Sequence, residues 1–179
     1  NLANGFTNEM AQVTASNGDF ILMCAAACDG SGSASVTTTL TAATSGTTFA
    51  NALTIQPYTG ETITILGSVT LSSSEAYVIL KGFKVDKTGN PGGDDAVVLF
   101  NGPNIHHLRL DTMEIAGGLD DNGIVIANIS HHNELLNVHS HHHGGVAGGH
   151  CVYIEDSDDD VVDGGSFHDC LFGAGIQTF

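Results

Sequence analysis

Positive charge is scarce in this chain of 179 residues. Four basic residues (Lys81, Lys84, Lys87 and Arg109) face 20 acidic ones, and the formal net charge is −16 at pH 7. Nucleic acids and anionic membrane surfaces are both bound through clustered lysine and arginine. The composition therefore argues against both partners. It leaves cations and polysaccharides as the partner classes to consider, an anionic polysaccharide needing bridging cations.

Long hydrophobic runs and helical periodicity are also lacking. The longest apolar run, FILMCAAAC from Phe20, is too short to cross a bilayer, so we expect no membrane insertion. No segment sustains the 3.6-residue period of an amphipathic helix, whereas strand formers punctuated by Gly, Asn and Asp dominate. No secretory signal opens the chain, which suggests mature, processed material or a piece of a longer protein.

Four cysteines, Cys24, Cys28, Cys151 and Cys170, are an even number, which fits two disulfides in an oxidising compartment. This indicates an extracellular or cell-surface protein. Cys24 and Cys28 would lie about 13 Å apart on a straight strand, so they can bridge only across a turn. Cys151 and Cys170 could pair within one later repeat, and the sequence leaves the connectivity open. Buried free thiols are the alternative.

Similar strand-like segments recur along the chain. AVVLF begins at Ala96, GIVIA at Gly123, CVYIE at Cys151 and GIQTF at Gly175, and a weaker VTLSS begins at Val69. Each is followed by a second β-like run and most by a Gly/Asp-rich stretch. A repeat of 24 to 28 residues made of short strands predicts an all-β parallel solenoid in which each repeat forms one coil. We expect one domain over 1–179, with an irregular cap and first coil over 1–50 and regular coils over 51–179.

Stacked coils bring equivalent residues into columns about 4.8 Å apart. Because strand side chains alternate, we expect two inward columns and an outward one between them. A turn column precedes these strands, and another column follows from aligning the second strands. The first inward column is Val97, Ile124, Val152 and Ile176, and the second is Leu99, Ile126, Ile154 and Thr178. The outward column is Val98, Val125, Tyr153 and Gln177, and the turn column is Asp95, Asn122 and His150. The second strands place His141 over His168, with Asp86 and Ala116 in the earlier coils.

A family resemblance is visible in the segments GDFILMCAAACDG, SGTTFANALTIQPYTGETITI, YVILKGFKVD and GGHCVYIEDSDDDVVDGGSFHDCLFGAGIQTF. Together they resemble the right-handed parallel β-helix, or pectate-lyase-like, superfamily over most of the chain. The resemblance implies a right-handed parallel β-helix. The superfamily includes polysaccharide lyases, glycoside hydrolases, epimerases, phage tailspikes, adhesins and passive stalks, so the fold does not decide the function.

Two groups of side chains are candidate metal ligands. Carboxylate pairs recur at one position of consecutive coils, and Ca²⁺ takes six to eight oxygen ligands, so a calcium site is one interpretation and a solvated acidic turn the other. Alternate histidines of one strand would share a face, and imidazole suits zinc, copper or nickel; surface histidines at a turn are the alternative. The calcium candidates are Asp94, Asp95, Asp120 and Asp121, and the transition-metal candidates are His139, His141 and His143.

A candidate catalytic set is His150, Tyr153, His168 and Arg109. His150 and Tyr153 lie close along one strand, as general acid–base catalysis requires, and Arg109 is a candidate base. GDDAV and GGHCVYI resemble the paired aspartates and the histidine element of polygalacturonase-type hydrolases. The Arg-x-Lys motif of those enzymes has no counterpart, because no basic residue follows Arg109.

The chain stops at Phe179, five residues into a coil. Solenoids end in polar caps, and an open strand edge pairs with other chains, so we expect this uncapped end to meet another chain or a second copy, or the chain to be a fragment. An extracellular structural, assembly or glycan-contacting β-helix, such as a filament or surface-layer component, is therefore the first functional hypothesis. A polysaccharide lyase or glycoside hydrolase is the second.

Overall fold

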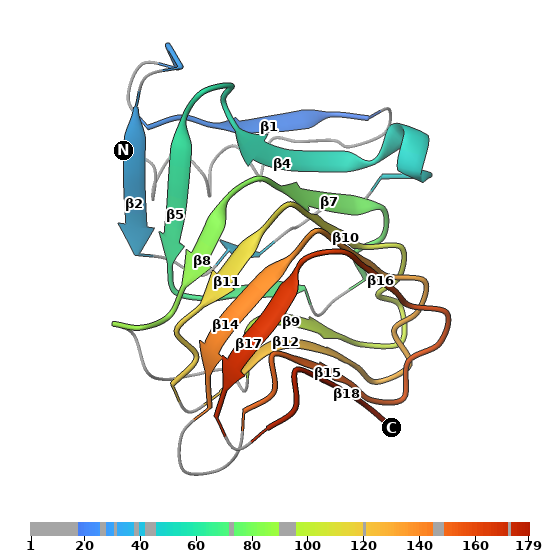
Figure 1. The fold of residues 1–179 in the computed structure, drawn as a ribbon. Helices are drawn as coiled ribbons and strands as arrows, with labels where there is room; N and C mark the ends of the chain where they lie inside the picture. The colour runs from blue at the N-terminus through green and yellow to red at the C-terminus, as the bar shows by residue number, and fades with distance from the viewer. Residues whose placement is uncertain are drawn as a thin grey trace.

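The computed structural model describes residues 18–25, 28–30, 32–37, 40–41, 46–71, 74–89, 96–119, 121–144, 149–171 and 173–179. These residues form a parallel β-solenoid of about five turns (Figure 1), which confirms the predicted fold class. Every strand pair in the three sheets is parallel, because each strand pairs with its equivalent in the neighbouring coil.

Each coil contributes one strand to each of three six-stranded sheets. Sheet A contains β1 (Phe20–Met23), β4 (Leu53–Pro57), β7 (Val78–Lys81), β10 (Arg109–Asp111), β13 (Glu134–Leu136) and β16 (Val161–Asp163). Sheet B contains β2 (Ser33–Thr37), β5 (Thr62–Leu66), β8 (Lys84–Asp86), β11 (Glu114–Ala116), β14 (His139–His143) and β17 (Ser166–Cys170). Sheet C contains β3 (Leu40–Thr41), β6 (Val69–Leu71), β9 (Ala96–Asn101), β12 (Asn122–Ala127), β15 (Val152–Ile154) and β18 (Ile176–Thr178). One short 3₁₀ helix, η1 (Phe49–Asn51), precedes β4.

The hydrophobic core fills the space between the three sheets. Leu110 of sheet A, Ile115 of sheet B and Ile124 of sheet C are all fully buried. Each sits at an inward position of a short strand, as strand alternation requires, and in β12 the neighbouring Val125 is buried as well, in a second cluster with Ala96 and Ala127. The core therefore continues from coil to coil as stacked aliphatic columns.

The predicted columns are correct in the later coils and wrong in β9. Ile124, Val152 and Ile176 stack, but their partner in β9 is Val98 rather than Val97, and Phe100 takes the place predicted for Leu99. The coil from Val69 to Val98 has 29 residues (98 − 69) and the next, to Ile124, has 26 (124 − 98). A shift of one residue exchanges the two faces of a strand, so aligning AVVLF one residue out of register with the later strands gave the wrong face.

The alignment of the second strands is confirmed. His141 pairs with His168, Ala116 pairs with His141, and Asp86 pairs with Ala116. One outward column of sheet B therefore carries two histidines and a carboxylate.

Both predicted disulfides are present, and the free-thiol alternative is wrong. Cys24 and Cys28 bridge across a turn in which Cys28 has a φ of 53°, with 5.0 Å between their Cα atoms. Cys151 and Cys170 join the start of β15 to the end of β17, with 5.5 Å between their Cα atoms. Two disulfides are compatible with an extracellular protein. Among the described residues, no helix has the length and apolar character needed to span a bilayer.

Strands β16, β17 and β18 form one edge of the three sheets. Val161, Ile176 and Phe179 are exposed there, Phe179 to 72%. Association of this edge with another chain stays a prediction.

Candidate functional site

The turns before four strands of sheet A, β7, β10, β13 and β16, repeat the same backbone geometry. Parallel bridges join Ala76 to His106, His106 to His131, and His131 to Asp158. The residue after each of these is left-handed: Tyr77, His107, His132 and Asp159 have φ values of 55°, 55°, 57° and 58°. Histidine and aspartate are among the non-glycine residues that tolerate this conformation best. The turn thus places two side-chain columns side by side along the solenoid.

Four imidazoles occupy the middle of these two columns, and we call His106, His107, His131 and His132 the histidine ladder. The His106 and His131 rings stack with centroids 5.1 Å apart, and those of His107 and His132 with centroids 4.9 Å apart. Within each coil the two Nδ1 atoms lie at hydrogen-bond distance, 2.8 Å for His106–His107 and 2.9 Å for His131–His132. The doublets His106–His107 and His131–His132 are visible in the sequence as surface pairs with a weaker claim to a metal than the histidines of β14, but their stacking into one cluster was not predicted.

Aromatic and charged groups border the histidine ladder. Tyr77 stacks on His107 with ring centroids 4.6 Å apart, and Phe49 contacts Tyr77 edge-on. Arg109 lies over the Phe49 ring, 4.3 Å from its centroid, and its Nε donates to Glu134 at 2.6 Å. Burial lowers the pKa of His106 and of His107, and repulsion from the neighbouring imidazoles lowers both further. Both rings are therefore neutral at pH 7.

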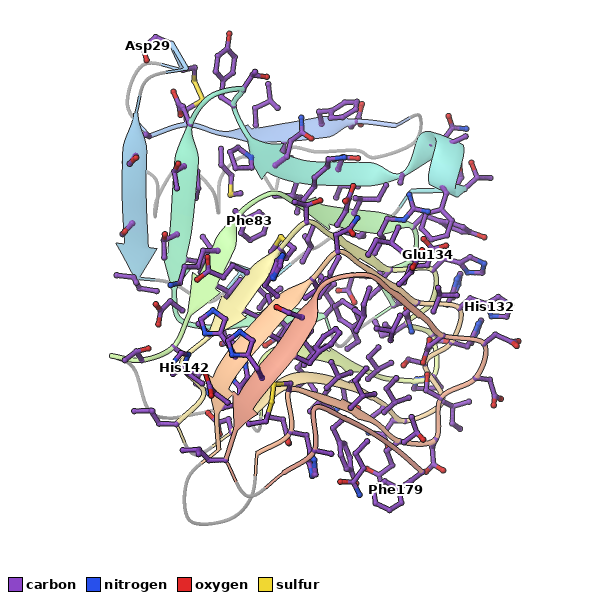
Figure 2. All side chains as sticks on the ribbon, in the orientation of Figure 1. Asp29, Phe83, His132, Glu134, His142 and Phe179 are labelled. Carbon is purple, nitrogen blue, oxygen red and sulfur yellow. A yellow bond between two sulfur atoms is a disulfide. The ribbon has the colours of Figure 1, made fainter. Side chains whose placement is uncertain are left out.

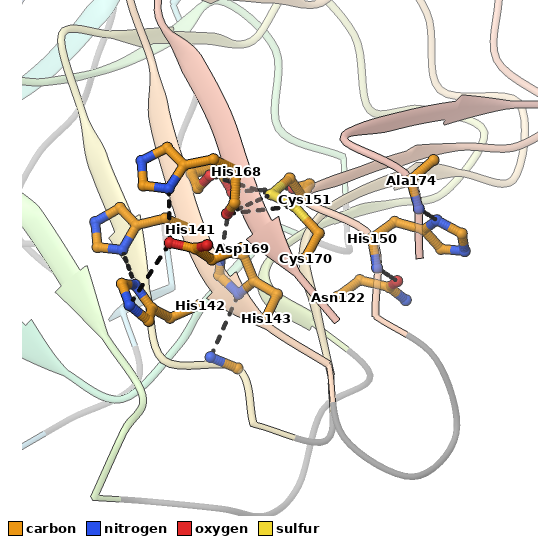
Figure 3. The surroundings of a disulfide bond; sticks show 12 residues. Asn122, His141, His142, His143, His150, Cys151, His168, Asp169, Cys170 and Ala174 are labelled. Carbon is orange, nitrogen blue, oxygen red and sulfur yellow. Dashed lines mark hydrogen bonds and ion pairs between the residues drawn. A yellow bond between two sulfur atoms is a disulfide. The ribbon is translucent and has the colours of Figure 1, made fainter. Parts of the chain in front are cut away.

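A second cluster lies on the outer face of sheet B. His141 and His168 stack with centroids 5.3 Å apart, and His168 Nδ1 is 2.9 Å from Asp169 (Figure 3). His141 Nε2 is 3.3 Å from Glu114. Lys84 also pairs with Glu114, at 3.0 Å. Burial alone would raise the pKa of Glu114, but Lys84 and His141 hold it below its usual value. The hydrogen bond from His168 lowers the pKa of Asp169. These imidazole–carboxylate pairs are suited to proton transfer.

The three candidate ligands of β14 do not share a face. His139 and His141 point outward, but His143 is fully buried. His142 is left-handed, with a φ of 60°, and this interrupts the alternation on which the prediction rested. His143 Nδ1 accepts the Gly118 N–H at 3.3 Å, and its Nε2 lies 3.0 Å from Ser140 Oγ, which donates to the Cys151 carbonyl.

The predicted catalytic set is spread over three sheets. Arg109 begins β10 of sheet A, His168 lies in β17 of sheet B, and Tyr153 lies in β15 of sheet C. His150 stacks on Tyr153 with centroids 5.4 Å apart, as predicted, but the Cys151–Cys170 disulfide separates it from His168 (Figure 3). The His150 Nδ1 accepts the Ala174 N–H at 2.9 Å, so this ring nitrogen is occupied by a backbone hydrogen bond. The structure thus brings together two of the four residues.

The acidic calcium candidates are only partly visible. Asp94, Asp95 and Asp120 lie outside the described residues. Asp121 accepts from Lys87 Nζ at 2.6 Å, and Lys87 is only 2% exposed. A cation at Asp121 would therefore have to compete with a buried ammonium. In the part of the chain that the structure describes, no three or more His, Cys, Asp or Glu side chains are grouped to hold a metal.

A groove with a mixed polar and apolar lining lies at another turn of the solenoid, after the strands of sheet C. Its volume is about 510 Å³, and the sequence analysis missed it. The Asn128 amide donates to Asn101 Oδ1 in the preceding coil. Ile129 has a φ of 65° and is 64% exposed, a strained geometry for a β-branched residue, and such strain concentrates at functional sites. The lining residues are Asn101, Gly102, Pro103, Asn128, Ile129 and Asp156.

Comparison with protein-family models, with curated proteins and with solved structures finds no match to this chain.

Proposed function

We propose that this chain is an extracellular structural β-helix that contacts a neutral glycan through the groove at Asn101, Asn128 and Asp156. The groove carries the proposal, because it combines two amides from neighbouring coils, one carboxylate and the exposed apolar surface of Ile129 and Pro103. The two disulfides fit the extracellular setting, and the resemblance to the pectate-lyase-like superfamily fits a polysaccharide ligand.

The side chains of the groove suit sugar hydroxyls. An amide has two N–H donors and an acceptor oxygen, and a carboxylate accepts from two hydroxyls at once. Asn101 and Asn128 already share one hydrogen bond, which fixes the orientation of both amides. No lysine or arginine lines the groove. Asp156 would repel a uronate, so a neutral polysaccharide is the expected ligand.

Substituting Asn128 by glycine tests this site. Glycine accepts the φ of 58° at this position, so the amide is removed without backbone strain. We expect Asn128→Gly to weaken binding by about tenfold. This corresponds to about 1.4 kcal/mol, near the upper end of the net contribution of one hydrogen bond. The measurement is affinity electrophoresis of the full chain in gels containing xylan, galactomannan, β-glucan or polygalacturonate.

The matched control is Asn137→Gly, an exposed asparagine with a φ of 52° at a turn far along the coil from the groove. It should migrate like the unmodified protein. Equal effects of the two substitutions, or retardation by polygalacturonate alone, would contradict the neutral-glycan site.

A second candidate is a polysaccharide lyase or hydrolase that acts on the face of sheet B. Two imidazole–carboxylate pairs, His168–Asp169 and His141–Glu114, favour it. The rings of His141 and His168 stack in neighbouring coils, so a general acid and a general base could stand one coil apart. Lyase products absorb in the ultraviolet. We expect product formation from a polysaccharide panel to stop in His168→Asn if this candidate is correct; activity that survives the substitution would exclude sheet B as its site.

A further inference from the structure

The paired Nδ1 atoms of the histidine ladder have the spacing of two adjacent ligands on one metal ion. They lie 2.8 Å apart in His106–His107 and 2.9 Å apart in His131–His132. With a metal–nitrogen distance of about 2.0–2.1 Å, two nitrogens at a right angle are about 2.9 Å apart, and two at a tetrahedral angle about 3.3 Å apart. Right angles are typical of tetragonal Cu²⁺ and Ni²⁺ sites. The spacing therefore favours these ions over Zn²⁺.

Metal binding at a pair needs a change of tautomer but no net loss of a proton. In the His106–His107 pair, whose pKa values are lowered, one neutral imidazole donates its Nδ1–H and the other accepts. If the donor moves its proton to Nε2, both Nδ1 lone pairs become available to the ion. Neutral imidazole is the form that ligates metals through either nitrogen.

The surroundings of the histidine ladder also suit a cation. His132 Nε2 lies 3.6 Å from Asp159 Oδ2, in the next coil of the same column. Histidine ligands commonly direct their second ring nitrogen to a carboxylate, which fixes the ring and raises its basicity. Glu134 lies at the same edge of the solenoid as His132 (Figure 2). Arg109 is the cation nearest in the chain, and Glu134 neutralises it at 2.6 Å.

We propose that the histidine ladder, His106, His107, His131 and His132, binds a divalent late transition metal, with Cu²⁺ held more tightly than Ni²⁺ or Zn²⁺. Each ion takes two nitrogens from one doublet, and water completes its coordination. Such a two-ligand site agrees with the absence of larger ligand groups in the described residues. The proposal is independent of the glycan groove.

The His141–His142 pair is the competing location on the opposite edge of the solenoid (Figure 2). Its Nδ1 atoms are 2.5 Å apart, shorter than the right-angle spacing. Its rings contact carboxylates through Nε2, His141 with Glu114 at 3.3 Å and His142 with Asp169 at 3.8 Å, as His132 does with Asp159, so these contacts do not distinguish the two locations. This pair is a single doublet, whereas the histidine ladder has two doublets stacked 4.9–5.1 Å apart.

The first test uses the unmodified full chain and CuCl₂. Isothermal titration should give binding that EDTA reverses, with affinity falling from Cu²⁺ to Ni²⁺ and Zn²⁺. In NMR spectra, substoichiometric Cu²⁺ should broaden the ring resonances of the histidine ladder and leave those of His150 sharp. Sharp ladder resonances at saturating Cu²⁺ would overturn the proposal without any variant.

The second test compares variants with the same backbone requirement. His107, His132 and His142 are all left-handed, and asparagine tolerates that conformation. The double variant His107→Asn/His132→Asn should bind Cu²⁺ at least about tenfold more weakly, because loss of a second-shell partner alone costs 10–100-fold. His142→Asn should bind like the unmodified protein. The reverse result, with His142→Asn losing the ion, would overturn the proposal.

Discussion

Acidification from about pH 7.5 to about pH 5 is expected to lower the free energy of unfolding by about 2 kcal/mol, mainly through His143. The side chain is fully buried, and burial lowers its pKa from 6.5 to about 4, against a smaller raising effect of a backbone hydrogen bond with Ile115. Its Nδ1 accepts the Gly118 N–H and therefore carries no proton in the folded state. Protonating it would remove that bond and leave a charge in the core.

The direction of this effect follows from the two pKa values. The unfolded chain binds the His143 proton near pH 6.5, whereas the folded chain binds it only near pH 4. The stability is therefore complete above pH 6.5 and is lost as the pH falls to 4, about 3 kcal/mol in all. The pKa values of Asp86 and Asp111 are lowered from 3.8, so their stabilisation is present above that pH and lost below it. Glu114, whose pKa is lowered from 4.5, begins to contribute only near pH 5, so a series that ends there reports mainly on the histidines.

Urea unfolding across this pH range measures the effect. His143→Asn removes the titrating group, so its stability should be lower at pH 7.5 but should fall much less toward pH 5. The remaining slope comes from His106, His107 and His141, whose pKa values are also lowered. The exposed neighbour His142 provides the control: its charge is only the last of the causes that shift the pKa of His143, so His142→Asn should keep most of the slope. An unchanged slope in His143→Asn would show that this imidazole does not titrate as we argue.

The repeat could be predicted from the sequence because every coil of a solenoid buries aliphatic residues at equivalent positions. Aliphatic residues at one position, such as Ile124, Val152 and Ile176, had to stack, and they do. The register of β9 was not readable. AVVLF is apolar at every position, so both faces fit the core pattern, and only the length of the preceding loop decides that Val98 and Phe100 point inward.

The candidate sites were harder to predict, because they depend on left-handed backbone conformations at residues whose type does not indicate them. A φ of 60° at His142 turns His143 into the core, which no alternation rule anticipates. The same conformation at His107 and His132 builds the histidine ladder. The doublets were visible in the sequence, but the coil lengths that stack them were not. The groove at Asn128 likewise depends on consecutive left-handed residues.

Substituting Asp121 by asparagine is expected to destabilise the protein by about 3 kcal/mol, at the lower end of the range for breaking a buried ion pair because Asp121 is partly exposed. Lys87 Nζ lies 2.6 Å from Asp121 Oδ2, and the lysine side chain is only 1% exposed. Asparagine keeps the size and a hydrogen-bonding oxygen but removes the charge. The Lys87 ammonium would then stay in the protein interior without its neutralising carboxylate.

A double-mutant cycle separates the charge from the packing. Lys87→Met fills a similar volume without charge and leaves Asp121 able to reach water, so it should cost about 1 kcal/mol or less. The combination Lys87→Met/Asp121→Asn should be more stable than Asp121→Asn alone, because no buried charge remains. Urea unfolding at pH 7.5 gives the coupling energy. If Lys87→Met fails to rescue Asp121→Asn, the aspartate acts through contacts other than the ion pair. Rescue would establish that Lys87, next to β8, and Asp121, next to β12, interact as a charge pair, with which a calcium ion at Asp121 would have to compete.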